Sequence, residues 1–198
     1  PAVSEPNPVV DLWVDLRHAD LRDLITLQRL GTRAVVGSFG ASPRGQLPAR
    51  PEERLERALA EGLPRLEAAG LGGGLCLGIG PGQIPRQGRE RLLAALPEFL
   101  GAPGVLGIGP IGPGPELAGA PGGPGAGQGI EEAVRHRVLG AQLEFASALR
   151  RPVLLALPRG EQSRAVATVG EAVRSAGVPP ATVVVLHGEV ASIQILHS

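Results

Sequence analysis

The chain has 198 residues, a formal net charge of zero and 43% hydrophobic residues, which fits one domain large enough for a hydrophobic core. The balanced charge, without a long run of basic residues, gives no support to nucleic-acid binding. No apolar run approaches the roughly 18 residues that a membrane span needs, so we expect a cytoplasmic protein with no membrane partner. The single cysteine, Cys76, excludes an internal disulfide, and we expect it to be a buried thiol.

Six apolar segments are the expected β-strands, and each is followed by a segment with helical spacing. The strands are predicted over residues 9–16, 33–39, 74–80, 104–112, 152–158 and 182–188. The helices are predicted over residues 21–30, 51–70, 89–100, 130–150 and 161–177, with a final short helix starting near Glu189. Because the strands are almost continuously apolar, both faces of the sheet should be covered, as in a parallel sheet.

Polar, glycine and proline residues set the expected limits of these segments. Asp20 is the expected N-cap of the first helix, and Gly31 and Gly177 should end the first and fifth helices. Pro64 should kink or divide the second helix. Pro110 should end the regular pairing of the fourth strand.

The fourth helix and the segment before it differ sharply in composition. Residues 113–129, PGPELAGAPGGPGAGQG, have no periodicity, so we expect a flexible Gly/Pro-rich loop. The helix that follows should bury one stripe of side chains at helical spacing. That stripe is formed by Val134, Val138, Phe145 and Leu149.

Six βα units fit two architectures, a TIM-type (β/α) barrel that ends after about six units or an open parallel α/β sheet. A full barrel takes about 250 residues, so we expect residues 1–198 to be a single barrel domain whose C-terminal part is missing. An incomplete barrel exposes sheet edges, which a second copy or another protein should cover. In either architecture, functional residues lie at the carboxyl ends of the strands.

Four segments keep the order and spacing of a known pattern. Residues 14–36, VDLRHADLRDLITLQRLGTRAVV, resemble an Asp-x-His-x-His strand followed by a short helix and Gly-x-x-Ala-Val-Val. Residues 104–112 resemble a Gly-Glu-Ile-Gly strand, and residues 142–158 resemble a Gln-containing helix leading into a strand that ends Pro-Val-x-x-His. Residues 178–190 resemble a strand ending in His, with Glu after it. Together they resemble the TatD family of metal-dependent hydrolases, and particularly its EboB-like branch.

The resemblance implies an amidohydrolase-like TIM barrel that holds one or two divalent metals (Zn, Mn or Mg) for phosphoester hydrolysis. It also implies which positions of this chain correspond to the family's ligands, namely Arg17, Ala19, Pro110, Ala156 and His187. Of these, His187 alone keeps a metal-binding side chain, because arginine does not deprotonate and Ala and Pro side chains have no donor atom. The family's last ligand, an Asp, would lie beyond residue 198.

The replacements predict a metal site that has been lost. A catalytic divalent metal needs about three protein ligands and an open position for water. Shifting the alignment so that His18 becomes a ligand would place it on the face opposite Asp15, because strand side chains alternate, unless a loop after Leu16 turns it back. A relocated site would have to use His18, Asp20, His187 and Glu189.

The same strand ends offer candidates for anion binding. Arg17 would place a fixed positive charge near the family's metal position, with Asp15 as its expected partner. Arg159 and His187 complete a candidate pocket for a phosphate or carboxylate, since guanidinium groups match such anions. Alternatively, Arg17 is only a counter-charge for buried polar groups.

The leading interpretation is therefore a TatD-like pseudoenzyme with a degenerate metal site and no cofactor, which binds a small anionic ligand or a protein partner. The second interpretation is an active metal-dependent hydrolase or nuclease with an atypical site. The third is an unrelated open α/β binding module. A Rossmann-like module should carry glycine in the turn after the first strand, and the turn here, RHADLRD, has none.

Overall fold

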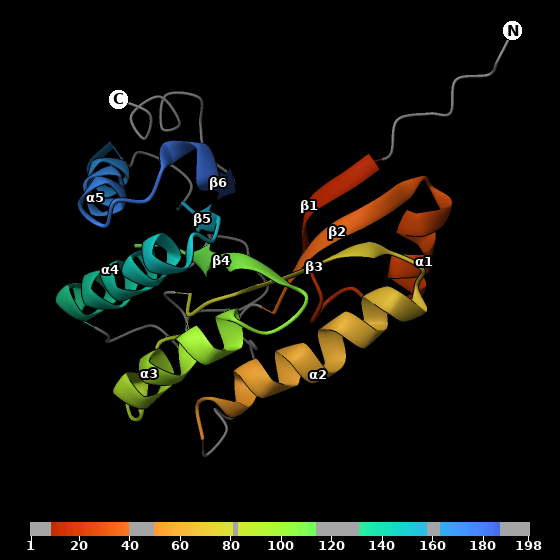
Figure 1. Cartoon of the computed structure of the whole chain (residues 1–198), viewed down its shortest axis with the longest axis horizontal. Helices are drawn as coiled ribbons and strands as arrows, with labels where there is room; N and C mark the ends of the chain where they lie inside the picture. Colours follow the sequence, from red (N-terminus) through yellow and green to blue (C-terminus); the bar gives the residue numbers. More distant parts are fainter. Residues whose placement is uncertain (1–8, 40–49, 81–82, 114–130, 158–162, 187–198) are drawn as a thin grey trace, which may run out of the picture.

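The computed structural model describes residues 9–39, 50–80, 83–113, 131–157 and 163–186, in which strands and helices alternate (Figure 1). The strands are β1 (Val9–Asp15), β2 (Thr32–Ser38), β3 (Gly72–Leu77), β4 (Val105–Ile111), β5 (Val153–Ala156) and β6 (Val183–Leu186). The helices are α1 (Leu21–Arg29), α2 (Glu53–Ala68), α3 (Arg89–Leu100), α4 (Glu132–Leu149) and α5 (Ser163–Ser175), with a 3₁₀ turn at Pro180–Thr182. The predicted helix near Glu189 and residues 114–129 of the predicted loop lie outside the described residues.

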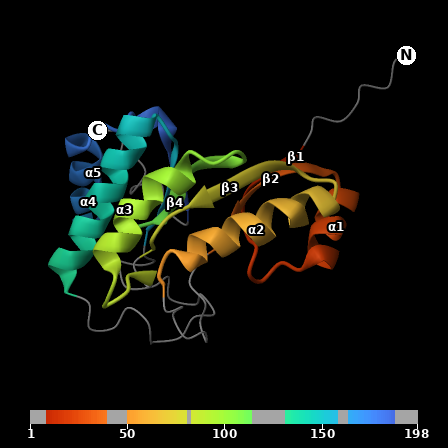
Figure 2. The ribbon, with the colours of Figure 1, turned by 60° about the horizontal axis from the view of Figure 1, so that its bottom comes forward.

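All six strands run parallel and lie in the sheet in chain order, from β1 to β6. Figure 2 shows the helices following one another in the same order along one side of the sheet. A doubly wound sheet would instead reverse its strand order and place helices on both faces. The fold is a curled α/β half-barrel of TIM type with six strands, and in the described residues β1 and β6 each pair with one neighbour.

The main hydrophobic core lies between the sheet and its helices. Leu75, Ile108 and Leu155 of the strands are completely buried there, with Leu96 and Leu143 of the helices. Burying a leucine side chain contributes roughly 1.5–3 kcal/mol, so this face of the sheet supplies most of the stabilisation. Among the described helices, none is both long and apolar enough to cross a membrane.

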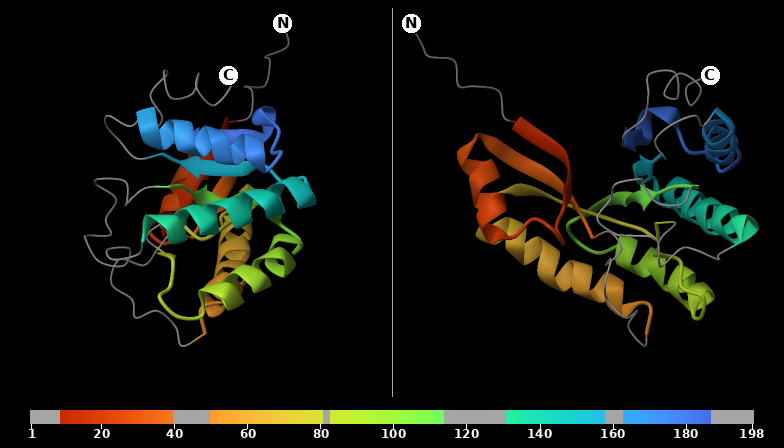
Figure 3. Two further views of the ribbon diagram at one scale, coloured as in Figure 1. Left: turned by 90° about the vertical axis from the view of Figure 1, so that its left-hand side faces the viewer. Right: turned by 180° about the vertical axis from the view of Figure 1, so that it is seen from behind.

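Figure 3 shows the helices on the outer side of the curled sheet, and apolar side chains line its inner face. Cys76, Leu154 and Leu186 form a separate small cluster there, against Trp13 and Val36. Near them, 37% of both Leu106 and Val184 stays exposed; Val184 pairs with Leu154 in register and therefore shares its face. The expectation that both faces are covered is wrong for the described residues, because a half-barrel does not close over its own interior.

Helix α2 is continuous from Glu53 to Ala68, so Pro64 does not divide it, which was one of the two outcomes expected there. Proline removes the amide that would bond to the carbonyl of Ala60. Both Pro64 and Ala60 lie on the exposed side of the helix, where water can satisfy that carbonyl. Gly62 lets the same helix pack closely, since a Cβ there would lie 2.7 Å from the ring of Phe39.

One expectation is confirmed at Pro110 and another is corrected in α4. The regular pairing of β4 is lost around Pro110, since its pairing with β5 is irregular between Ile108 and Ile111, although the strand itself continues to Ile111, which meets Leu155. Leu149, placed in the buried stripe of α4, is 41% exposed because it is the last residue of the helix. The stripe that is buried consists of Val138, Leu139, Gln142, Leu143 and Ala146.

The predicted helix limits are confirmed at three positions. Asp20 caps α1 and forms a reciprocal capping box with Asp23. Gly31 and Gly177 follow α1 and α5 with positive φ angles of 103° and 67°, a conformation that glycine adopts without strain.

Candidate functional site

The chain turns sharply where β1 ends. The backbone amides of His18 and Ala19 both donate to the carbonyl of Asp15, at 3.0 Å, which makes residues 15–19 a tight turn. Arg65 of α2 holds this turn from outside by donating to the carbonyls of Leu16, at 2.6 Å, and of Ala19. The turn is therefore fixed at the carboxyl end of the strand, where TIM-type folds carry their functional residues.

Arg17 and Asp15 form the expected ion pair at this turn. The Arg17 Nε donates to Asp15 Oδ1 at 3.0 Å and its Nη2 to Oδ2 at 2.5 Å, a forked geometry that aligns both groups. The backbone amide of Arg17 also donates to Oδ1, at 3.1 Å. About a fifth of each side chain is exposed, 21% for Arg17 and 18% for Asp15.

One nitrogen of the Arg17 guanidinium takes no part in the ion pair with Asp15. Its Nη1 is buried and has no hydrogen-bond partner among the residues that the structure describes. A buried donor without a partner costs free energy, about 1–3 kcal/mol and more on a charged group. The pairing with Asp15 fits the interpretation of Arg17 as a counter-charge. That interpretation does not explain why the buried Nη1 has no acceptor among the described residues.

His18 lies closer to Asp15 than strand alternation predicts. The strand ends at Asp15, so the alternation no longer applies at residue 18. The imidazole Nε2 lies 4.0 Å from Asp15 Oδ2, and 44% of the side chain is exposed. The expectation from strand alternation therefore does not hold here, and the turn at residues 15–19 realises the loop alternative. The Asp15 carboxylate is already bonded to Arg17.

The side chain of Asp20 caps the N-terminus of α1. Its Oδ1 accepts hydrogen bonds from the amides of Arg22, at 2.7 Å, and Asp23, at 3.0 Å. These backbone hydrogen bonds, from Asp23 first and then Arg22, lower the pKa of the Asp20 carboxyl. The carboxylate is a helix cap, which makes it a poor metal ligand.

The other positions implied by the resemblance carry no ligand. Ala19, Pro110 and Ala156 lie at the ends of β1, β4 and β5, where their side chains offer no donor. Arg159, His187 and Glu189 lie outside the described residues. Within the described ranges, no three His, Cys, Asp or Glu side chains gather closely enough to hold a metal ion. The residues present at these described positions do not fit the family's metal centre.

Cys76 is buried as expected and faces the inner side of the sheet. Burial raises the pKa of its thiol to about 11, so the thiol stays protonated at neutral pH. A protonated, enclosed thiol is a poor nucleophile and a poor metal ligand.

Two glutamines hold the loop that follows β3. Gln142 of α4 is completely buried, and its amide bonds to both the N–H and the C=O of Ile79 after β3, at 2.7 and 3.1 Å. Gln83 accepts from the amide of Gly80 at 3.2 Å. These bonds fix the loop after β3, which forms one wall of a hollow beside α2.

Arg54, which sequence reasoning missed, reaches into that hollow from the first turn of α2. Its Nη1 donates to the carbonyl of Gln83 at 2.9 Å. In the sequence, Arg54 is one of several arginines in a helix rich in charged residues. Only the packing of α2 against the loop after β3 distinguishes it.

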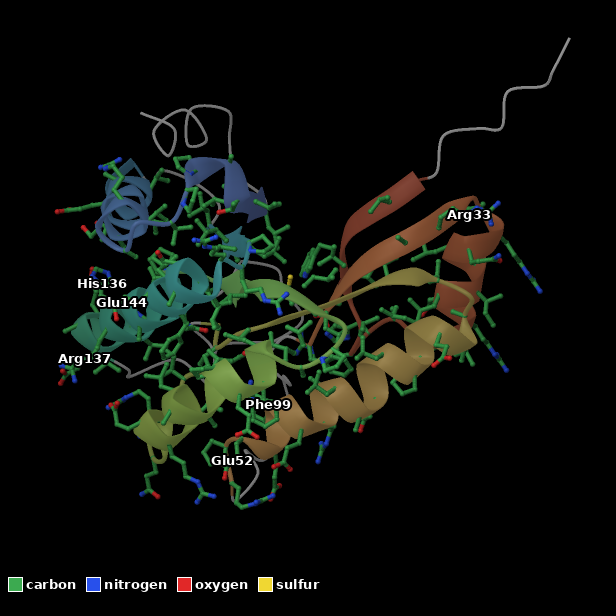
Figure 4. The ribbon with its side chains drawn as sticks, viewed as in Figure 1. Arg33, Glu52, Phe99, His136, Arg137 and Glu144 are labelled. Carbon is green, nitrogen blue, oxygen red and sulfur yellow. The ribbon has the colours of Figure 1, made fainter. Side chains whose placement is uncertain are left out.

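The charged residues of α4 lie far from these strand ends. Figure 4 shows His136, Arg137 and Glu144 on the outer edge of the molecule. His136 Nε2 lies 3.6 Å from Glu132, one helical turn away, as expected for a surface residue.

No protein-family model matches the chain, and no curated protein matches it. Among solved structures, it is similar to the crystal structure of a TatD-like protein from Archaeoglobus fulgidus. The TM-score is 0.73 at 22% sequence identity, and the match covers 96% of this chain and 72% of that chain. At this identity the similarity shows a shared fold, which agrees with the TIM-type half-barrel.

Proposed function

We propose that this chain is a degenerate member of the TatD family, from its EboB-like branch, which binds a small anion and does not catalyse hydrolysis. The observation that carries the proposal is the Arg17 guanidinium, which lies at the end of β1 with a buried Nη1 that no described residue satisfies. An anion within reach of this nitrogen would supply the missing acceptor.

The residues around Arg17 support binding over metal-dependent hydrolysis. A cation at this position repels a divalent metal, and Asp15 already has both oxygens bonded to Arg17. The turn is held rigidly by backbone hydrogen bonds and by Arg65. A rigid donor of fixed charge is suited to holding an anion in one place.

The first test is metal retention. The purified protein is offered Zn, Mn and Mg, dialysed, and analysed by elemental mass spectrometry. We expect less than about a tenth of a metal per chain, since too few donors remain. Near-stoichiometric metal that disappears in His187→Ala would overturn the proposal and favour an active hydrolase with an atypical site.

The second test is calorimetric titration with inorganic phosphate. We expect the wild-type protein to bind it and Arg17→Gln to bind about tenfold more weakly or worse, since the variant loses a charge-assisted donor. Arg33→Gln is the matched control, because Arg33 is an exposed arginine near the amino end of β2, whereas Arg17 lies at the carboxyl edge of the sheet (Figure 4). Equal affinity in all three proteins would contradict a site at Arg17.

The inner face supports a second proposal, that another polypeptide covers it. Leu106 and Val184 are each 37% exposed on an otherwise apolar face, and Val10 is 51% exposed. Exposed apolar surface of this kind marks contact with another protein or a second copy. Light scattering coupled to size exclusion checks for self-association, and a monomer at all concentrations would exclude the second copy.

A further inference from the structure

Most of the large apolar side chains that stay exposed in the described residues lie at one end of the sheet, where the strands begin. Val10, Leu106 and Val184 are each the second residue of a strand, in β1, β4 and β6. Leu30 follows α1 and Leu149 ends α4, and each of these helices leads into the start of the next strand. Leu30 is the most exposed of them, at 77%. The amino end of the half-barrel is therefore its apolar end.

Two of the strand residues, Val10 and Leu106, lie on the inner face, on which the fold already places the exposed residue of β6. Val10 pairs in register with Ala34, which lies two residues from Val36 of the inner cluster. A Cβ at Gly74 would lie 2.9 Å from Leu106, and Gly74 pairs with Val36. The starts of the strands thus form an apolar patch on the concave side of the half-barrel.

Arginines lie directly beside the two exposed leucines at the edge of this patch. Arg29 precedes Leu30, and Arg150 and Arg151 follow Leu149. Within the described ranges, none of these three arginines forms an ion pair with an acid. A helix dipole favours a basic residue in the last turn, but it gives no reason for an exposed leucine next to it.

The charges at this end of the sheet do not balance. In the described residues, the last turns of the helices and the connections to the next strand contain two acids, Glu67 and Glu98. They contain Arg65 and Arg174 in addition to the arginines beside the leucines. The amino end therefore has an excess of fixed positive charge, which attracts an acidic partner.

Two other occupants match this surface less well. A second copy that docks through the same surface in a two-fold dimer would place arginines against arginines, because such a contact uses the same patch twice. A flat lipid surface can reach the leucines at the edge, but it does not follow a concave inner face. An acidic polypeptide segment with an apolar stripe matches both the charge and the curvature.

We propose that the amino end of the half-barrel docks an acidic amphipathic segment of another protein. Its apolar stripe lies on Val10, Leu106 and Val184, and its carboxylates face Arg29 and Arg150. This inference rests on the proposal that another polypeptide covers the inner face. It is independent of the anion site, which lies at the other end of β1.

The test uses a synthetic peptide of about 18 residues, five helical turns, with leucine on one face and glutamate on the other. A second peptide carries lysine in place of every glutamate. Trp13 is the only tryptophan of the chain and packs against the inner cluster, so its fluorescence reports on occupation of the inner face. We expect the glutamate peptide to shift the Trp13 emission and to bind at least about tenfold more tightly than the lysine peptide.

Charge reversal locates the binding surface. We expect the double variant Arg29→Glu, Arg150→Glu to weaken binding of the glutamate peptide about tenfold or more, since like charges then face each other. Arg137→Glu is the matched control, because Arg137 is an exposed arginine near the start of α4, at the opposite end of that helix from Arg150 (Figure 4). Unchanged binding by the double variant would overturn the inference.

The outcomes separate this inference from the proposal on which it rests. If both peptides bind equally well and charge reversal has no effect, the inner face still binds polypeptide but the acidic partner is wrong. If neither peptide changes the Trp13 emission, both fail. If phosphatidylserine vesicles change the emission and the glutamate peptide does not, the surface binds lipid and the inference is overturned.

Hydrogen exchange on the wild-type protein decides the matter even if a variant is unstable. We expect the glutamate peptide to slow amide exchange at the starts of β1, β4 and β6 and to leave α2 unaffected. Protection confined to other parts of the chain would overturn the inference.

Discussion

Two polar clusters at the strand ends of one sheet differ in whether their hydrogen bonds are complete. At the end of β3, the amide of Gln142 has partners for both its oxygen and its nitrogen, between 2.7 and 3.2 Å, including the carbonyl of Val138. At the end of β1, Arg17 keeps a buried nitrogen for which the described residues offer no acceptor. A polar cluster whose hydrogen bonds are all made within the protein stabilises the fold. A cluster with an unsatisfied donor can gain a hydrogen bond when a ligand binds.

The largest expected effect is on stability, at the complete cluster. Gln142→Leu keeps the volume but leaves the N–H and C=O of Ile79 buried without their partner. We expect the free energy of unfolding to fall by about 2–3 kcal/mol, measured by urea denaturation, with the phosphate affinity unchanged. An unchanged free energy of unfolding would mean that the two clusters do not differ as described.

The second-largest expected effect is on the affinity for phosphate, at the Arg17 cluster. Asp15→Asn removes the carboxylate that neutralises Arg17 and leaves more positive charge for a ligand. We expect phosphate to bind about fivefold more tightly, measured by calorimetry. Weaker binding would show that the Asp15 carboxylate is needed to orient Arg17.

Asp20 tests whether a nearby polar group belongs to the scaffold. We expect Asp20→Ala to lower the unfolding temperature by about 2–4 °C at pH 7 through loss of the helix cap, without changing phosphate affinity. Because the pKa of Asp20 is lowered from 3.8 in the folded state, its contribution is complete above pH 3.8 and is lost as the pH falls through the folded pKa. Thermal unfolding of both proteins at pH 7 and pH 2.5 checks this: the difference should shrink at the lower pH.

The smallest expected effect is at His18. Its imidazole lies 4.0 Å from the Asp15 carboxylate, and 44% of the side chain is exposed. We expect His18→Ala to change metal retention, phosphate affinity and unfolding temperature by no more than the experimental error. A loss of bound metal in this variant would instead support a relocated metal site.

Much of the fold could be predicted from the sequence. The six strands, the five helices between them and the helix-ending glycines follow from local spacing and backbone preferences. The effect of a proline on its element could not be read fully from the sequence. Pro64 does not divide α2, and Pro110 interrupts the regular pairing of β4 without ending the strand. A proline disrupts structure only where the lost hydrogen bond cannot be replaced, and this depends on its exposure and its neighbours in the tertiary structure.

For the candidate site, too, some features could be predicted from the sequence and others required the tertiary structure. The sequence determined that Arg17 follows the first strand and that Ala19, Pro110 and Ala156 supply no metal ligands, and it suggested Asp15 as a candidate partner of Arg17. Only the tertiary structure decided that His18 turns back toward Asp15 and that Arg54 reaches the hollow beside the loop after β3. Side-chain chemistry is local and can be read along the chain, whereas the surroundings of a side chain such as Arg54 depend on how its helix packs against the rest of the fold.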